Sequence, residues 1–183
     1  YILIESPRNT LEEELANALN DLEAQGIDSL IIDVRSNTGG YLKGATSIAS
    51  IFLEKGKTIY SLEGKDSTDV YVDETDEKRD YKVAVLINDG SASASEVLAA
   101  ALKESYGATL IGTTSYGKGK VQLTKNLEDG SMVKYTTARW LTPSGECIDE
   151  IGIDPDYLVN LEQDENGVYK DTQLEKAKEL LSQ

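Results

Sequence analysis

Short apolar runs alternate with amphipathic segments along most of the chain. Apolar runs typical of buried strands occur at 30–34 and 82–87, and predicted helices follow them at 42–52, with apolar residues at helical spacing, and at 91–104, with many alanines. Further strands are predicted at 2–4, 58–62, 70–72, 109–111, 120–127 and 132–141, and further helices from Leu11 to Gly26 and over 172–181. A capping-box pattern at 10–13 begins the first helix, and Asp129-Gly130 predicts a hairpin turn. This alternation of strand, turn and helix predicts an α/β domain.

Length and composition support one globular domain covering residues 1–183. Apolar residues make up 39% of the chain and charged residues 28%, which is far from the composition of a disordered protein. The longest apolar runs, such as 83–87, are too short to cross a bilayer. With 33 acidic and 18 basic residues the net charge is −15, which disfavours binding to nucleic acid or to an anionic membrane.

The absence of histidine limits the possible chemistry most strongly. It excludes Ser-His-Asp and Cys-His catalysis and any histidine-ligated metal. We expect neither a metal nor a cofactor. A nucleophilic enzyme would have to take its base from Lys, Asp, Glu or Tyr. The single cysteine, Cys147, forbids an internal disulfide and is expected to be a half-buried thiol. Because the chain begins with Tyr1 rather than Met, we expect it to be a piece of a longer protein.

Two turns stand out because each contains Asn and Gly between a buried strand and a helix. They lie at 35–40 and 88–90, and backbone N–H groups at the start of a helix stabilise anions. The second turn continues into Ser91, Ser93 and Ser95. These serines either cap and pack the helix start, or one of them is a nucleophile beside an oxyanion-binding backbone.

A serine nucleophile needs a base, and the candidate is Lys118 between Gly117 and Gly119. The alternative is a solvated loop lysine. A lysine acts as a base where burial or neighbouring charges lower its pKa, so the role calls for a buried, partnered side chain.

Other motifs in the chain are rejected because the surrounding residues do not fit them. The sequence from Gly112 to Lys118 matches part of a phosphate-binding loop, but Gly119 replaces the Ser or Thr that binds magnesium, and a strand pattern follows. Ser115-x-x-Lys118 resembles a penicillin-binding motif that requires a helix. The acidic run 73–77 is interpreted as a solvated loop, and the acidic residues at 149–156 lack the spacing of a calcium loop. Asp33 and Arg35 are expected to brace the turn that follows them.

Four segments together resemble the carboxy-terminal processing, or tail-specific, serine peptidases. They are 33–40, 88–96, 116–122, and 141–145 with 152–156, and the likeness runs over nearly the whole chain in order. The resemblance implies a Clp-protease/crotonase-like α/β core of repeated strand–helix units, here with an additional β-hairpin region. It also implies an isolated catalytic core without the PDZ domain of the family. Thr38 stands where the family usually has Pro.

The resemblance also implies the roles of individual residues. Ser93 matches the nucleophile, Lys118 the general base and Gln122 the residue that orients the lysine. The oxyanion donors would be the backbone N–H groups of Ala94 and of Gly39 or Gly40. In a straight strand, residues 118 and 122 lie about 13 Å apart, so we predict a bend or bulge at Gly119.

The implied partners are polypeptides with accessible carboxyl tails, and the implied location of the full-length protein is outside the cytoplasm. The implied activity is serine endopeptidase cleavage near those tails through an acyl-enzyme. One alternative is a peptide-binding module on the same fold without turnover. A second alternative is an acyl-CoA enzyme of the crotonase type. Neither the residues nor the resemblance indicates an oligomeric state.

Overall fold

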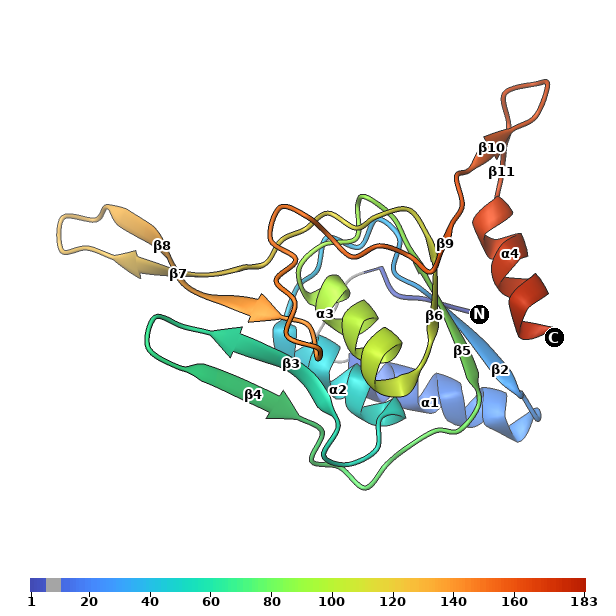
Figure 1. Ribbon diagram of the computed structural model, residues 1–183, viewed down its shortest axis with the longest axis horizontal. Coiled ribbons are helices and arrows are strands. Elements are labelled where there is room, and N and C mark those ends of the chain that lie inside the picture. Colours follow the sequence, from blue (N-terminus) through green and yellow to red (C-terminus); the bar gives the residue numbers. More distant parts are fainter. Residues whose placement is uncertain (6–10) are drawn as a thin grey trace.

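The computed structural model describes residues 1–5 and 11–183, and its centre is a parallel sheet (Figure 1). The strands of this sheet follow the order β1 (Ile2–Leu3), β2 (Ser29–Asp33), β5 (Lys82–Ile87), β6 (Thr109–Gly112) and β9 (Tyr157–Leu158). Each neighbouring pair is parallel, so the carboxyl ends of all five strands lie along one edge.

Helices cover both faces of this sheet. Alternate residues of a strand point to opposite faces, and Leu30 and Ile32 therefore join the main core while Ile31 joins a smaller one. The main core contains residues of α1 (Leu11–Ala24), α2 (Leu42–Phe52) and α3 (Ala94–Ala101). The smaller core contains Ala177 of α4 (Thr172–Leu181), and Figure 1 shows α4 on the side of the sheet away from α1, α2 and α3.

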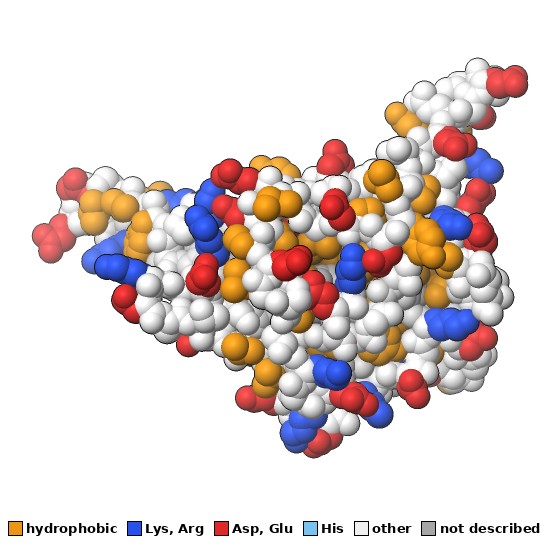
Figure 2. Space-filling model, viewed as in Figure 1, with side chains coloured by type: hydrophobic (Ala, Val, Ile, Leu, Met, Phe, Trp, Pro, Cys, Tyr) orange, Lys and Arg blue, Asp and Glu red, His pale blue; other side chains and the backbone are white. Residues whose placement is uncertain are grey.

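A second, antiparallel sheet has the strand order β4 (Thr68–Val72), β3 (Thr58–Glu63), β8 (Met132–Leu141) and β7 (Lys120–Asn126). Only the carboxyl end of β8 pairs with β3, so the rest of the β7–β8 hairpin projects from the body (Figure 1). Its exposed apolar side chains are Leu123, Leu127, Met132, Val133 and Tyr135. Figure 2 shows apolar and basic side chains side by side on this hairpin.

The elements predicted from the sequence are confirmed apart from three details. The helix predicted over 91–104 begins only at Ala94 and divides into α3 and a π-helix, η1 (Leu102–Tyr106), which ends at Gly107 with a φ of 94°. The short strand β9 and the hairpin β10 (Glu162–Gln163) with β11 (Tyr169–Lys170) were not predicted. Thr10 of the predicted capping box lies outside the described residues.

Arg35 ties α4 to the turn that follows β2. Its guanidinium donates to the buried carboxylate of Asp33 at 2.6–3.1 Å and to both oxygens of Asp171 at 2.8 Å. Asp171 also caps α4 by accepting from the Leu174 N–H at 3.0 Å. The expectation that Asp33 and Arg35 brace this turn is confirmed.

The Asp171→Asn variant is expected to be less stable than the wild type at neutral pH, by less than about 1 kcal/mol because the carboxylate is partly exposed. The guanidinium of Arg35 lowers the pKa of Asp171, so the ion pair stabilises the fold above the ordinary Asp pKa. This contribution is lost as the pH falls through the lowered value. Urea unfolding of the wild type and the variant at pH 7 and at acid pH measures the free energy of unfolding with the carboxylate charged and with it protonated. A difference that does not change with pH would contradict a stabilising role of the Asp171 charge.

Candidate active site

Two turns at the carboxyl ends of β2 and β5 lock together. These strands are neighbours in the parallel sheet, so the turns that follow them meet at the same edge. The Ser36 N–H donates to Asn88 Oδ1 at 2.7 Å, and the Ala92 N–H donates to the Asn37 carbonyl at 2.9 Å. Each turn therefore fixes the backbone of the other.

The three serines of the second turn have different surroundings. The hydroxyl of Ser91 donates to the Val34 carbonyl at 2.7 Å, and that of Ser95 donates to the Asn37 carbonyl at 2.9 Å. Both serines are buried, whereas Ser93 is half-buried and lines a pocket. Packing at the start of the helix therefore explains Ser91 and Ser95, and Ser93 remains the candidate nucleophile.

Ser93 has an unusual backbone conformation. Its φ is 59° and its ψ is −118°, values that glycine adopts readily and that other residues adopt at a penalty of roughly 1–3 kcal/mol. Such strain tends to occur at functional sites, because it places a side chain where a regular turn would not. Here the strained residue immediately precedes α3, at the edge of the pocket.

One pocket of about 320 Å³ contains most of the residues singled out in the sequence. Ser93 and Ala94 line it from the start of α3, Gly40 from the turn before α2, and Lys118 and Gln122 from the loop before β7 and from β7 itself. The remaining lining residues are Leu42, Val97, Lys120, Val121, Lys134 and Trp140. Segments far apart in the sequence thus meet around Ser93.

The structure distinguishes the two candidate oxyanion glycines. The Gly39 N–H already donates to Asn37 Oδ1 at 2.9 Å, whereas Gly40 lines the pocket. Ala94 is the first residue of α3, so its N–H has no acceptor within the helix. The geometry favours Gly40 and Ala94 as the donors.

Gly39 has a different function, because it allows the two turns to approach closely. Its φ is +86°, and a Cβ at this position would lie 2.5 Å from the Ala92 carbonyl oxygen and 2.9 Å from Ser93 Cβ. Only a glycine fits between the turns without displacing Ser93.

The Gly39→Ala variant is expected to lose about a hundredfold in kcat/KM, because the Ser93 turn has to move away from the new methyl group. Gly56→Ala is the matched control, since Gly56 has the same φ of +86° but nothing within 4 Å of its added Cβ. Both variants should lose roughly 1–2 kcal/mol of stability through the left-handed backbone. Equal activity in the two variants would contradict the supporting role of Gly39.

The backbone of Lys118 is fixed, but its side chain is exposed. Its N–H donates to Glu96 Oε2 at 3.0 Å, and its carbonyl accepts from Trp140 Nε1 at 2.8 Å. The side chain lines the pocket without the burial that the sequence analysis calls for. Gln122 is exposed as well, and its Nε2 donates to Thr136 Oγ1 at 3.4 Å. The structure therefore places both side chains at the pocket but shows no hydrogen bond between them within the described residues.

The prediction of a bend at Gly119 is wrong in its position. The register of β7 and β8 shifts between Val121 and Gln122, and Thr137 is the extra residue on β8. Gly119 has a different reason to be glycine, because a Cβ there would lie 2.8–3.0 Å from atoms of Asp149. Its small size serves close packing against the segment at 149, while the irregularity occurs nearer to Gln122.

Glu96 is a central residue of the site that the sequence analysis missed. Its carboxylate is fully buried and accepts from the Ser93 and Lys118 N–H groups at 2.7 and 3.0 Å through Oε2. Through Oε1 it accepts from the Ser115 hydroxyl and the Gly117 N–H at 2.6 and 2.7 Å. One carboxylate thus holds both the turn that contains Ser93 and the loop that contains Lys118. The Ser-x-x-Glu spacing of a capping box at 93–96 is the sequence signal that could have indicated it.

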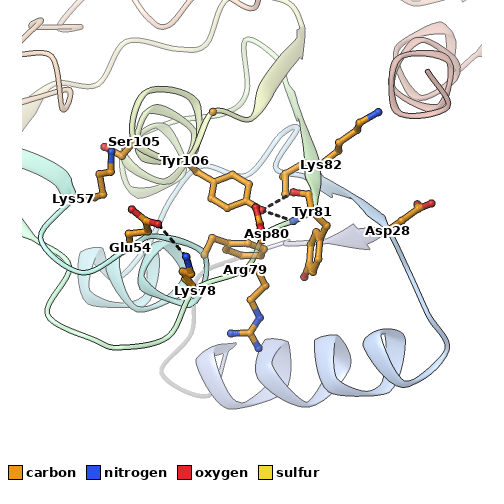
Figure 3. A pocket seen from close by; sticks show the side chains of 13 residues that line it. Asp28, Glu54, Lys57, Lys78, Arg79, Asp80, Tyr81, Lys82, Ser105 and Tyr106 are labelled. Carbon is orange, nitrogen blue, oxygen red and sulfur yellow. Dashed lines mark hydrogen bonds and ion pairs between the residues drawn. The ribbon is translucent and has the colours of Figure 1, made fainter.

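A separate pocket of about 600 Å³ lies at the opposite ends of the strands (Figure 3). Asp28 and Lys82, beside the amino ends of β2 and β5, line it. Figure 3 shows Tyr106 of the π-helix pointing at the backbone of Tyr81, whose carbonyl accepts from the phenol at 2.6 Å. This pocket is therefore distinct from the site around Ser93.

Some of the acidic residues singled out in the sequence have structural partners. Asp149 and Glu150 both pair with Lys120, at 3.1 and 2.8 Å. The interpretation of 73–77 as a solvated loop is wrong for Asp73, which is buried and accepts from the Thr75 N–H at 3.2 Å. In the described part of the chain, no group of three or more His, Cys, Asp or Glu could hold a metal ion.

Comparison with known proteins places the chain in a family. The sequence profile of peptidase family S41 matches residues 1–159. The chain belongs to this family of serine peptidases. The resemblance to carboxy-terminal processing peptidases and the Clp-protease-like α/β fold are thereby confirmed.

The curated relatives include a carboxy-terminal processing protease and proteases named after it. Carboxy-terminal processing protease CtpA of Bacillus subtilis is 44% identical over 161 residues, covering 87% of this chain and 34% of the relative. A probable CtpA-like serine protease of Staphylococcus aureus is 41% identical over 87% of this chain and 33% of its own length. The chain thus spans about a third of these relatives.

A solved S41-like structure supports the same assignment. The photosystem II D1 C-terminal processing protease superimposes with a TM-score of 0.82 at 32% identity, covering 91% of this chain and 44% of its own. Within the residues described, no helix has both the length and the apolar character required to span a membrane.

Proposed function

We propose that residues 1–183 form one catalytic core domain of a serine endopeptidase that cleaves polypeptides near their carboxyl termini. The observation that carries the proposal is the pocket shared by Ser93, Lys118 and Gln122, with Gly40 and Ala94 at its wall. The names of the relatives support the class of substrate, which is a polypeptide with an accessible carboxyl tail. The location of the full-length protein outside the cytoplasm stays a prediction.

In the first step the hydroxyl oxygen of Ser93 attacks the scissile carbonyl carbon while the neutral amine of Lys118 accepts the hydroxyl proton. The carbonyl oxygen becomes an oxyanion, to which the N–H groups of Gly40 and Ala94 donate. The tetrahedral intermediate then collapses. The C–N bond breaks, and Lys118 gives its proton to the leaving amine.

In the second step water hydrolyses the acyl-enzyme. Lys118 takes a proton from the water as its oxygen attacks the ester carbon, and the same N–H groups hold the second oxyanion. The C–O bond to Ser93 breaks, and the proton returns from Lys118 to the serine oxygen. The enzyme is regenerated with no cofactor consumed.

Because the Lys118 side chain is exposed, its proposed role as a base requires a bound substrate to cover it. Withdrawal from water disfavours the charged form of an amine, so that the uncharged form can accept a proton. A polypeptide lying across the pocket would cover the exposed Lys118 in this way. Gln122 lines the same pocket, and its side-chain carbonyl can accept from the lysine amine once Gln122 turns away from Thr136. We infer that the catalytic contacts form when substrate is bound.

The direct test is detection of the acyl-enzyme. The chain is incubated with an unstructured protein that has an apolar carboxyl tail, and both the products and the acid-quenched enzyme are analysed by mass spectrometry. Products cut near the carboxyl terminus, together with an acyl adduct mapped to Ser93, are expected. Bound but intact substrate would instead indicate a peptide-binding module, and an adduct on another residue would refute the assignment of the nucleophile. A thermal shift on addition of coenzyme A would favour an acyl-CoA enzyme.

A further inference from the structure

A second groove, of about 680 Å³, lies between α2 and the β3–β4 hairpin. We call it the α2–β4 groove. Its apolar and aromatic lining residues are Leu42, Ile59, Tyr60, Val70, Tyr71 and Val72. Polar and charged residues line the rest of the groove, namely Glu12, Lys43, Thr46, Ser47, Ser50, Glu74 and Thr75.

The α2–β4 groove adjoins the Ser93 pocket. Leu42, the first residue of α2, lines both of them. Gly40, whose N–H is assigned to the oxyanion, lies only two residues before Leu42. A chain held in the Ser93 pocket would have to pass over Leu42 to reach the groove.

The part of the groove formed by β3 and β4 suits an extended, apolar peptide. Val70, Tyr71 and Val72 are 59%, 41% and 39% exposed, although they adjoin the buried Ile59 and Tyr60. The rings of Tyr60 and Tyr71 stack with centroids 4.5 Å apart, which forms a flat aromatic surface. β4 is the edge strand of its sheet, and an edge strand offers backbone N–H and C=O groups to an added strand.

The length of the groove defines how much peptide it can hold. Between Leu42 and Ser50, which both line it, an α-helix rises by about 12 Å. An extended chain covers this distance with about four residues.

We propose that the α2–β4 groove binds a segment of about four apolar or aromatic residues of the polypeptide substrate, adjacent to the segment held in the Ser93 pocket. This inference rests on the proposed function. It assigns part of the substrate preference to residues away from the reacting bond, with Val70, Tyr71 and Val72 as specificity determinants. A shorter substrate would leave the groove empty.

The test compares cleavage of a short synthetic peptide with that of the same peptide extended by four Val or Tyr residues, at either end in separate probes. One of the extensions is expected to raise kcat/KM about tenfold. Val70→Asp should remove this gain and leave cleavage of the short peptide unchanged, and Val72→Asp should act alike. Val168→Asp is the matched control, because Val168 is 62% exposed and lies away from the groove.

Binding of the same fluorescent peptides to the Ser93→Ala variant separates failure of this inference from failure of the proposed function. Tighter binding of an extended peptide, abolished by Val70→Asp, supports the groove even if the wild type cleaves nothing. If neither extension changes kcat/KM or the affinity of the Ser93→Ala variant, the inference is overturned and the nucleophile assignment stays intact. A dimer that dissociates on Val70→Asp in sedimentation velocity would also overturn it, because a second copy would then be the occupant.

Discussion

The Ser93→Ala variant is expected to release no detectable cleavage products, and Lys118→Ala is expected to lose at least about a thousandfold in kcat/KM. Ser93 is the one serine of its turn that lines the pocket, since Ser91 and Ser95 are buried and bonded to neighbouring carbonyls. Lys118 is the proposed proton acceptor at the same pocket. Product release by the wild type and both variants is followed by mass spectrometry.

Lys120→Ala is the matched control for Lys118. Lys120 also lines the pocket, but its amine pairs with Asp149 and Glu150 and is therefore occupied. Its replacement should preserve most of the activity. Comparable losses at the two positions would indicate a general need for positive charge, and retained activity in Lys118→Ala would refute the general-base assignment.

The Glu96→Gln variant is expected to lose about a hundredfold in kcat and to unfold with about 3 kcal/mol less free energy. Four donors converge on this buried carboxylate, and two of them are the backbone N–H groups of Ser93 and Lys118. An amide presents only one acceptor oxygen, and its NH₂ group faces donors, so buried N–H groups are left without partners. Urea unfolding and steady-state kinetics measure the two effects.

Two further variants separate a positioning role of Glu96 from general destabilisation. Ser115→Ala removes one of the four donors and should lower stability with a smaller loss of kcat. Glu128→Gln changes an exposed acid in the β7–β8 turn and should change neither quantity. If Glu96→Gln remained fully active while folded, the carboxylate would not be needed to position the two catalytic segments.

The fold could be predicted where local patterns are strong. The apolar run in β5 and the helical spacing in α2 indicate their elements without any tertiary information. β9 could not be predicted, because its two residues are exposed and its strand character arises only from pairing with Ile111 and Gly112. The π-helix was missed because its sequence continues the helical pattern of α3.

The site could be predicted in outline from the resemblance and in detail only from tertiary contacts. From composition alone Ser91, Ser93 and Ser95 are equivalent, and their burial distinguishes them. Glu96 contacts groups at 115, 117 and 118 that no local pattern connects to it. The glycines beside Lys118 permit either an exposed or a buried side chain, so the sequence could not determine which is present.

The strained backbone of Ser93 makes stability and activity favour different residues at this position. A glycine would adopt a φ of 59° without strain, so the fold without its proposed nucleophile would be the more stable one at this position. Directed evolution of this chain for heat resistance alone would therefore favour Ser93→Gly and an inert scaffold. A screen for a more robust enzyme would have to select for turnover in every round.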